Sequence, residues 1–185
     1  MKIKLSGEIK ESIVDGPGIR YVVFTQGCHH HCKGCHNPET HDVNGGYFKE
    51  IDEIVEDFKK YPYMNGLTLS GGEPFLQKKE ILKLILEFKI LYPQKNILIF
   101  TGFNFEDLSK ANDESINEIL KNTDYLIDGK FILEQRDISL KFRGSTNQRI
   151  IDVKKSLESN TVVEIKKYDK FSKNKNEIKK VQIYV

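Results

Sequence analysis

The residues of this sequence best equipped for chemistry are its three cysteines, Cys28, Cys32 and Cys35. No other cysteine occurs in the 185 residues, and an odd number gathered between positions 28 and 35 argues against a framework of disulfides. The spacing lets three thiolates converge on one centre. Three thiolates bind three irons of a cubane and leave the fourth iron open, whereas fully ligated clusters take four cysteines. The cysteine loop therefore predicts a 4Fe–4S cluster whose open iron takes part in chemistry.

Zinc is the alternative metal for this loop, because thiolates and imidazoles together form structural zinc sites. Five histidines accompany the cysteines: His29, His30, His31, His36 and His41. Structural zinc sites usually show two pairs of ligands separated by a spacer, and no second pair occurs in this sequence. The loop by itself favours iron and sulfur and leaves zinc open. We assign the histidine run no ligand role, because a solvated loop explains it.

A second segment of interest, residues 67–74, reads Leu-Thr-Leu-Ser-Gly-Gly-Glu-Pro, an apolar run that ends in a glycine pair. Gly71 and Gly72 carry no Cβ, so a ligand can approach the backbone closely there. Pro74 stiffens the turn that follows. Taken alone, the segment is equally a tight turn between a strand and a helix.

A third segment places an acid and a base around Gly129, at the end of another apolar run. In a β conformation Asp128 and Lys130 point to the same face, where one could meet ribose hydroxyls or a cation and the other a carboxylate. An ordinary surface pair at a strand end is the alternative. Thr101, which with Gly102 closes a further apolar run, is a weaker candidate for the same rim.

The elements that must position these residues follow from an alternation of short apolar runs with amphipathic ones, the pattern of parallel β/α units. Five runs predict strands buried on both faces: Tyr21–Gln26, Gly66–Ser70, Asn96–Thr101, Tyr125–Asp128 and Arg149–Val153. Apolar residues at helical spacing predict three helices: Glu50–Tyr61, Gln77–Tyr92 and Asp113–Asn122. The cysteines follow the first predicted strand, at the end where β/α folds place their chemistry.

The expected fold is an α/β fold, an abbreviated, open partial (β/α) barrel. Right-handed crossovers make an open arrangement economical, and a closed eight-unit barrel takes about 250 residues. We expect residues 1–155 to form the core and residues 156–185 to be a lysine-rich extension of the same domain. Within that extension, alternating apolar and polar residues in Thr161–Lys167 and Lys179–Val185 predict an antiparallel hairpin.

Composition excludes several classes of function. The 29 basic and 27 acidic residues leave a net charge of +2, which gives little support for nucleic-acid binding. No apolar run approaches the roughly 20 residues of a membrane-spanning helix, and the start of the chain alternates charged and apolar residues, unlike a signal peptide. A cytoplasmic protein without nucleic-acid or membrane partners is expected.

Together, these segments resemble the radical S-adenosylmethionine (SAM) enzymes. The pattern Cys-x3-Cys-x2-Cys after the first strand is the signature of that family, and the Gly-Gly-Glu-Pro run of residues 71–74 is similar to its second motif. Many members carry an aromatic residue where this chain has Gly34. That departure matches the activases of anaerobic ribonucleotide reductase, which the chain also resembles in its segments 15–20, 35–40, 128–130 and 143–152.

The resemblance implies that the backbone of the glycine turn and Glu73, followed by Pro74, hold the methionine amino group of SAM, and that the SAM amino and carboxylate groups chelate the open iron. His36, Thr101, Asp128 and Lys130 are expected to contact SAM as well. No side-chain acid or base is needed for hydrogen abstraction, so no catalytic residue is expected beyond the cluster ligands.

For the substrate, the resemblance implies a glycine α-hydrogen of an anaerobic ribonucleoside-triphosphate reductase, which would become a glycyl radical. Asp15 and Arg20, in the turn before the first predicted strand, are candidate partner contacts, although ordinary turn chemistry also explains them. A low-potential electron donor such as flavodoxin is implied too. Three alternatives stay open: an activase of another glycyl radical enzyme such as pyruvate formate-lyase, a radical SAM enzyme acting on a small molecule such as a deazapurine precursor, and a non-catalytic zinc module.

Overall fold

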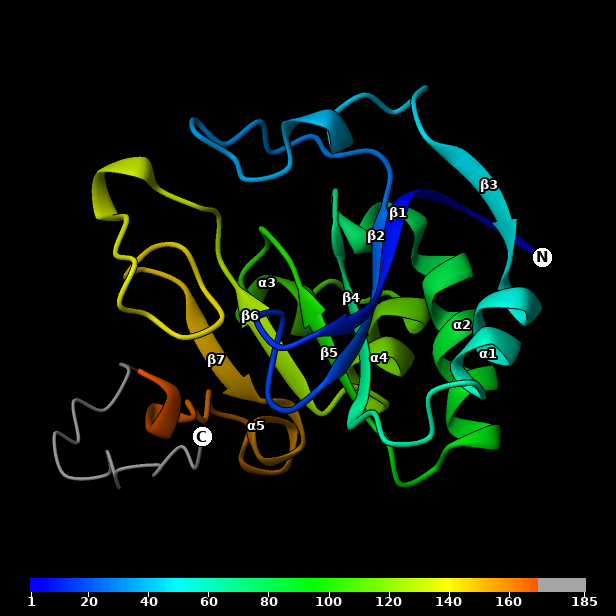
Figure 1. Ribbon diagram of the computed structural model, residues 1–185. Helices are drawn as coiled ribbons and strands as arrows, with labels where there is room; N and C mark the ends of the chain where they lie inside the picture. Colours follow the sequence, from blue (N-terminus) through cyan, green and yellow to red (C-terminus); the bar gives the residue numbers. More distant parts are fainter. Residues whose placement is uncertain (170–185) are drawn as a thin grey trace, which may run out of the picture.

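A computed structural model describes residues 1–169 of the chain. Its centre is one seven-stranded sheet in the order β3-β1-β2-β4-β5-β6-β7 (Figure 1). The strands are β1 (Lys2–Ser12), β2 (Arg20–Thr25), β3 (Tyr47–Glu50), β4 (Gly66–Gly71), β5 (Asn96–Phe100), β6 (Tyr125–Asp128) and β7 (Arg149–Asp152). The four central strands, β2, β4, β5 and β6, run parallel. Because β3 and β7 form opposite edges, the sheet is open, as the sequence predicts.

Helices follow most of the parallel strands. They are α1 (Ile51–Phe58), α2 (Lys78–Leu91), α3 (Phe105–Ser109), α4 (Glu114–Lys121) and α5 (Val153–Ser159), with 3₁₀ turns η1 (Pro38–Thr40), η2 (Pro74–Gln77), η3 (Leu133–Gln135) and η4 (Lys166–Tyr168). The helix α4 begins where the Asp113 carboxylate accepts a hydrogen bond from the Ile116 N–H. Pro93 lies two residues beyond the end of α2, where a helix cannot continue. Predicted and observed boundaries agree to within a few residues for all three predicted helices.

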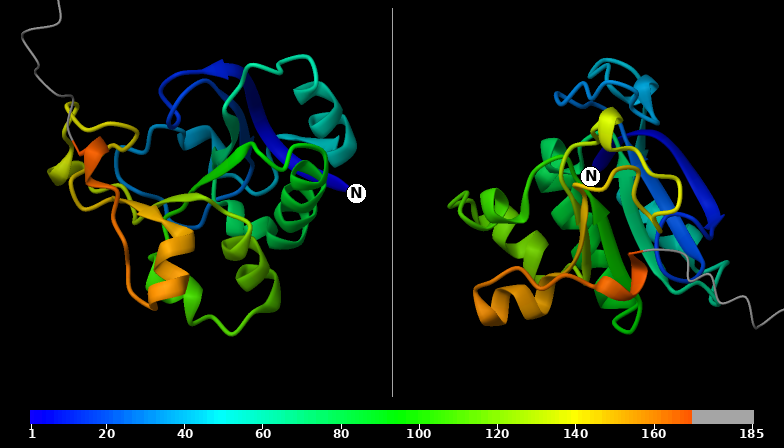
Figure 2. Two further views of the ribbon diagram at one scale, coloured as in Figure 1. Left: turned by 90° about the horizontal axis from the view of Figure 1, so that it is seen from below. Right: turned by 90° about the vertical axis from the view of Figure 1, so that its left-hand side faces the viewer.

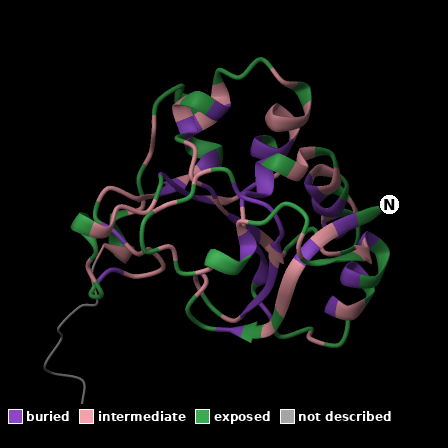
Figure 3. Cartoon of the chain, turned by 90° about the horizontal axis from the view of Figure 1, so that it is seen from above, coloured by how far each residue is buried: buried purple, intermediate pink, exposed green. Residues whose placement is uncertain are grey.

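The main hydrophobic core lies between the sheet and the layer of α1, α2 and α4 (Figure 3). Alternation along β4 sends Leu67 and Leu69 into this core and Thr68 and Ser70 to the opposite face. On that opposite face, a smaller cluster of Leu98, Ile127 and Ile150 packs against partly buried residues, among them Phe142, Ile165 and Tyr168. Ser70, on this face, lines both cavities of the candidate site.

Two strands, β1 and β3, escape the sequence-based prediction. β1 pairs antiparallel with β2 and buries Ile3 and Leu5, while β3 pairs antiparallel with β1. The cysteine loop therefore follows the second strand of the chain, which is the first of the parallel set. The strand β7 was expected to be parallel, and this prediction is wrong: Arg149–Asp152 pairs antiparallel with β6, because the connection from 129 to 148 returns along the sheet without a crossover helix.

The end of the described chain lies beside β7, on the side of the molecule opposite to β3 (Figure 2). Of the predicted hairpin, the arm Thr161–Lys167 makes two backbone hydrogen bonds with β7, from Asp152 N to Val163 O and from Ile165 N to Ile150 O, before it turns into η4. The other arm, Lys179–Val185, lies outside the described residues. No helix in residues 1–169 is long and apolar enough to cross a membrane.

Candidate functional site

Four segments that carry candidate functional residues meet at one edge of the sheet. The cysteine loop follows β2, the glycine turn ends β4, Thr101 and Gly102 follow β5, and Gly129 and Lys130 follow β6. Because these strands are parallel, their carboxyl ends lie side by side, and the cysteine loop extends over them at the top of Figure 1. The structure thus brings together segments that are up to about a hundred positions apart in the sequence.

A small cavity of about 140 Å³ collects side chains from all four segments. Its lining includes the three cysteines, both glycines of the turn, and other residues named from the sequence, among them His36, Thr101, Gly102, Gly129 and Lys130. Of the same motif, Glu73 and Pro74 are not among the described residues that line the small cavity.

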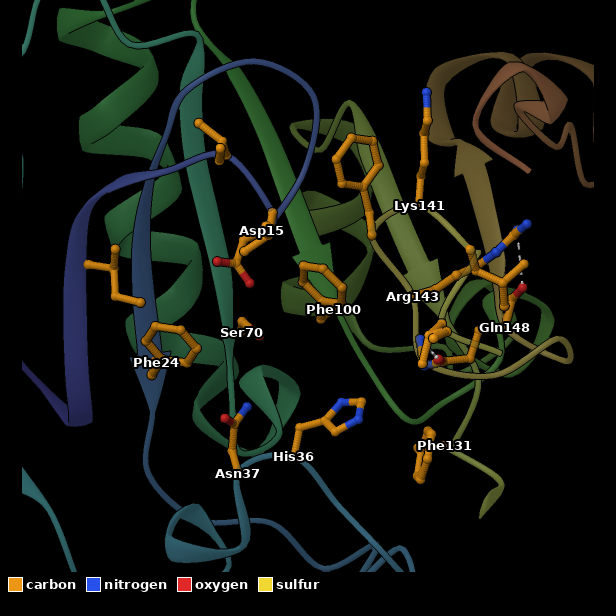
Figure 4. A pocket seen from close by; sticks show the side chains of 17 residues that line it. Asp15, Phe24, His36, Asn37, Ser70, Phe100, Phe131, Lys141, Arg143 and Gln148 are labelled. Carbon is orange, nitrogen blue, oxygen red and sulfur yellow. Dashed lines mark hydrogen bonds between the residues drawn. The ribbon is translucent and has the colours of Figure 1, made fainter. Parts of the chain in front are cut away.

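A larger cavity of about 800 Å³ adjoins the small one and shares part of its wall, including His36, Ser70, Phe100 and Gln148. Figure 4 shows Phe24, Ser70 and Phe100 on the strands at one side, with Phe131, Arg143 and Gln148 across from them. At its mouth lie three strongly exposed apolar side chains: Ile13 (74%), Val14 (70%) and Ile138 (84%). The larger cavity is therefore open to one side and largely apolar.

The cysteine loop offers three free thiols to the small cavity, one of them buried (Cys28) and two half-buried. Burial raises the pKa of the Cys28 thiol, and the backbone N–H groups of His30 and His31 act in the opposite direction. The Asn37 N–H donates to the Cys35 sulfur over 3.4 Å. Hydrogen bonds to sulfur are one of the means by which proteins tune iron–sulfur clusters.

A 4Fe–4S cluster fits this donor set. Within residues 1–169, no three His, Cys, Asp or Glu side chains are arranged about one point as ligands of a single ion would be. A cubane differs from a single ion, because each of its thiolate ligands binds a separate iron. Three thiols on the wall of one cavity, in a chain with no fourth cysteine, match a cluster that keeps one iron open.

The glycine turn lies close to the start of the cysteine loop. Gly71 has a φ of +93°, and a Cβ at Gly72 would lie 2.2 Å from the carbonyl oxygen of Gly27. Two backbone hydrogen bonds of 2.8 Å, from Gly72 N to Thr25 O and from Glu73 N to Gly27 O, join the two loops. The glycines are thus needed for a close approach of two backbones, and they also leave bare backbone on the cavity wall.

The carboxylate of Glu73 is buried behind that wall, with 1% of the side chain exposed. It accepts hydrogen bonds from Thr101 Oγ1 (2.9 and 3.0 Å), Gly102 N (2.9 Å) and Phe75 N (3.1 Å), and its Oε2 lies 2.8 Å from His30 Nε2. The sequence predicts a role for Glu73 and Thr101 in one site, and the structure does bring them into contact. It also adds His30, which sequence reasoning left without a role.

Asp128 and Lys130 do not share a face, contrary to the prediction. Gly129 has a φ of +92°, which breaks the alternation of the strand. Asp128 is buried at 1% exposure and accepts from Phe105 N (2.8 Å) and from Arg149 Nε (3.0 Å), whereas the exposed Lys130 lines the small cavity. Asp128 therefore supports α3 and β7, and only Lys130 of this pair faces the site.

The two candidate partner contacts, Asp15 and Arg20, lie in different surroundings. Asp15 is half-buried, accepts a 2.5 Å hydrogen bond from Ser12 Oγ and lines the larger cavity. Arg20 is the first residue of β2 rather than part of the turn before it, and its side chain is fully buried. It donates to Thr68 Oγ1 (2.9 Å), to Leu67 O (2.6 Å) and to the Asn96 side chain. In this structure Arg20 offers no surface to a partner and instead joins β2, β4 and β5.

Sequence reasoning assigned no individual duties within residues 143–152, and here Gln148 emerges as a residue of the site. Its Oε1 accepts from Gly144 N (2.9 Å) and its Nε2 donates to Gly129 O (3.0 Å), so it fixes the loop at 143–145 to the end of β6. Gln148 lines both cavities, and the Arg143 side chain lines the larger one. The polar turn ahead of an apolar strand was the signal available in the sequence.

Comparisons with known proteins identify the family of the chain. Residues 14–151 match the family described as 4Fe-4S single cluster domain. The chain is 40% identical over 144 residues to the anaerobic ribonucleoside-triphosphate reductase-activating protein of Vibrio cholerae serotype O1, a match that covers 75% of this chain and 90% of that protein. Proteins of the same name from Enterobacteria phage T4 and Escherichia coli K12 are each 37% identical, over 74% of this chain and 86% and 90% of their own lengths.

Proposed function

This chain belongs to the 4Fe-4S single-cluster domain family and to the family of anaerobic ribonucleoside-triphosphate reductase-activating proteins, and we propose that it generates the glycyl radical of such a reductase by reductive cleavage of SAM. The proposed assembly is an abbreviated radical SAM barrel comprising residues 1–155, with residues 156–185 as an extension of the same domain. A low-potential donor such as flavodoxin would supply the electron, in the cytoplasm, where thiols stay reduced.

The single observation that carries this proposal is the meeting of the three cysteines and the glycine turn on the wall of one small cavity, which adjoins a larger cavity with an open side. The small cavity supplies the ligands of a cluster with an open iron. The larger one has room for the remainder of SAM and for a segment of another protein chain.

When bound, the reduced cluster and SAM supply one-electron cleavage of a carbon–sulfur bond, which yields methionine and a 5′-deoxyadenosyl radical able to abstract a hydrogen atom. The duties of this chain are to bind and to orient. Cys28, Cys32 and Cys35 would ligate the cluster. The bare backbone of Gly71 and Gly72 would receive the amino group of SAM, with Glu73 and Pro74 shaping that turn from behind.

The remaining wall residues would orient SAM between the two cavities. Thr101 is fixed by its hydrogen bonds to the Glu73 carboxylate, and the ring of His36 packs against Phe131 with centroids 5.0 Å apart. Lys130 lines the small cavity, and its ammonium group suits the SAM carboxylate. Positioning of this kind carries the specificity, because reacting atoms must lie about 3–3.5 Å apart before attack.

The open side of the larger cavity supports a protein substrate. Its exposed apolar mouth, formed by Ile13, Val14 and Ile138, would be covered by a docked partner, and exposed apolar patches often mark such interfaces. Asp15 lies on the wall behind this mouth. The non-catalytic zinc module considered from the sequence is not retained, because the matched family is a 4Fe-4S domain.

The proposal is tested by anaerobic reconstitution with iron and sulfide, followed by addition of dithionite and SAM. Chromatography should detect 5′-deoxyadenosine with the wild-type protein and none with a Cys32→Ala variant. A preparation that binds zinc without iron or sulfide would contradict the proposal. If cleavage occurs and added small molecules rather than the reductase consume the radical, the assignment of a protein substrate is wrong.

A further inference from the structure

His30 is the one histidine of the cysteine loop that the structure places against the glycine turn. It lies midway between Cys28 and Cys32, and its Nε2 is 2.8 Å from Glu73 Oε2. Both partners are largely withdrawn from solvent, with exposures of 11% and 1%. His29, its neighbour in the same loop, is exposed. The loop whose cysteines are proposed to ligate the cluster is thus hydrogen-bonded, through His30, to the motif proposed to hold SAM.

The Glu73 carboxylate has a hydrogen-bond donor for each of its lone-pair positions, and His30 is one of these donors. A carboxylate has about four lone-pair positions, and four donors surround this one: Phe75 N, Gly102 N, Thr101 Oγ1 and His30 Nε2. The first belongs to the turn after β4, and the next two belong to the end of β5. Only His30 comes from the cysteine loop. Glu73 therefore joins three segments, and His30 is its link to the cluster ligands.

Gly102 provides the space in which the His30 ring lies. A Cβ at Gly102 would stand 2.4 Å from His30 Cδ2, so any other residue would displace the imidazole. On another side, the ring of Phe103 packs edge-on to His30, with centroids 4.8 Å apart and an interplanar angle of 73°. The imidazole also lines the small cavity beside the three cysteines. Its position is fixed by contacts with the end of β5 as well as by Glu73.

We infer that His30 is a positioning residue that locks the middle of the cysteine loop to Glu73, so that the cluster ligands and the wall proposed to hold SAM form a single unit. The inference rests on the proposed function and deepens it. The backbone hydrogen bond from Glu73 N to Gly27 O secures only the start of the loop. His30 secures the segment between Cys28 and Cys32, whose sulfurs must be placed accurately against the glycine turn, since a misplacement of about 1 Å costs about a hundredfold in rate.

The test uses two variants that break the contact from opposite sides. His30→Ala removes the donor, and Gly102→Ala fills the space of the ring while keeping the backbone N–H that donates to Glu73. His30→Gln keeps a side-chain donor and tests rescue. His29→Ala is the matched control, because it removes an exposed histidine from the same loop. Each full-length protein is reconstituted with its cluster under anaerobic conditions.

The readouts are iron content, the dissociation constant of SAM measured by equilibrium dialysis, and the change that SAM causes in the electron paramagnetic resonance (EPR) spectrum of the reduced cluster. We expect His30→Ala and Gly102→Ala to weaken SAM binding by about tenfold or more and to diminish the spectral change. The dissociation constant of SAM for the His30→Gln variant should stay within about threefold of the wild-type value. The His29→Ala control should bind SAM as the wild type does.

Two outcomes would overturn the inference while leaving the proposed function intact. One is a His30→Ala protein that binds SAM and changes its spectrum as the wild type does. The other is a loss of SAM binding that is as large in His30→Gln or in His29→Ala as in His30→Ala. The contact with Glu73 would then not be the cause of the loss. Failure of the wild-type protein itself to bind SAM would instead contradict the proposed function.

Discussion

Replacing Arg20 with methionine should lower the free energy of unfolding of the isolated protein, because Arg20 has a structural role that needs no partner. The guanidinium is fully buried and donates to Thr68 Oγ1, Leu67 O and the Asn96 side chain, thereby joining three neighbouring strands. Burial lowers the pKa of Arg20 to about 10, which leaves it charged at neutral pH. Methionine retains an apolar stem of similar length but none of the donors, so the acceptors on β4 and β5 lose their partner.

The magnitude follows from these three contacts. Hydrogen bonds to a charged group contribute about 1.5–3 kcal/mol each, which for three gives about 4.5–9 kcal/mol. Removal of the guanidinium also relieves the cost of burying a charge, and that cost is several kcal/mol. A net loss of about 2–4 kcal/mol is therefore expected. Against a total stability of about 5–15 kcal/mol, such a loss is large.

Urea unfolding of the cluster-free, reduced protein measures the effect by linear extrapolation, with an unchanged slope required for the comparison. Lys79→Met, an exposed lysine of α2, is the matched control and should change the free energy of unfolding by no more than about 0.5 kcal/mol. If Arg20→Met unfolds like the wild type but no longer binds the reductase, the structural role assigned to Arg20 is refuted and the partner contact expected from the sequence is restored.

Three further predictions concern other parts of the chain. The hydrogen-bonded guanidinium of Arg149 lowers the pKa of Glu106 from its usual 4.5 to about 2; this stabilisation is present above pH 4.5 and is lost as the pH falls towards 2, so Glu106→Gln should flatten the pH dependence of the unfolding free energy in that window. Gly72→Ala would place a Cβ 2.2 Å from Gly27 O, so reconstituted protein should retain less iron than the wild type by chemical analysis. Ile138→Asp, at the exposed mouth, should weaken binding of the reductase by about tenfold in calorimetry while 5′-deoxyadenosine formation without the partner stays unchanged; equal affinity would exclude this mouth from the interface.

The central strands and the longer helices could be predicted because their residues carry the burial pattern themselves. Leu67 and Leu69 alternate with Thr68 in β4, and Ile51, Ile54 and Phe58 repeat at helical spacing in α1. The strands β1 and β3 could not be predicted in the same way. In β3 the aromatic residues Tyr47 and Phe48 are exposed, so the strand has no buried face to mark it and depends on pairing with β1.

The candidate site could be predicted where motif and geometry coincide, as at the three cysteines and the glycine pair, which line one cavity. It could not be predicted where a single backbone angle decides. The positive φ of Gly129 turns Lys130 to the cavity and leaves Asp128 buried with Arg149. His30 also escaped prediction, because its partner Glu73 lies forty-three positions away and only the fold brings them together.

The most direct test of the central claim is the EPR spectrum of a purified anaerobic ribonucleoside-triphosphate reductase after incubation with this protein, SAM and a reductant in the absence of oxygen. The wild-type protein should produce a glycyl radical signal on the reductase, and a Cys32→Ala variant should produce none. A reconstituted wild-type protein that cleaves SAM but leaves the reductase without a radical, while it forms one on a different glycyl radical enzyme, would contradict the proposed function.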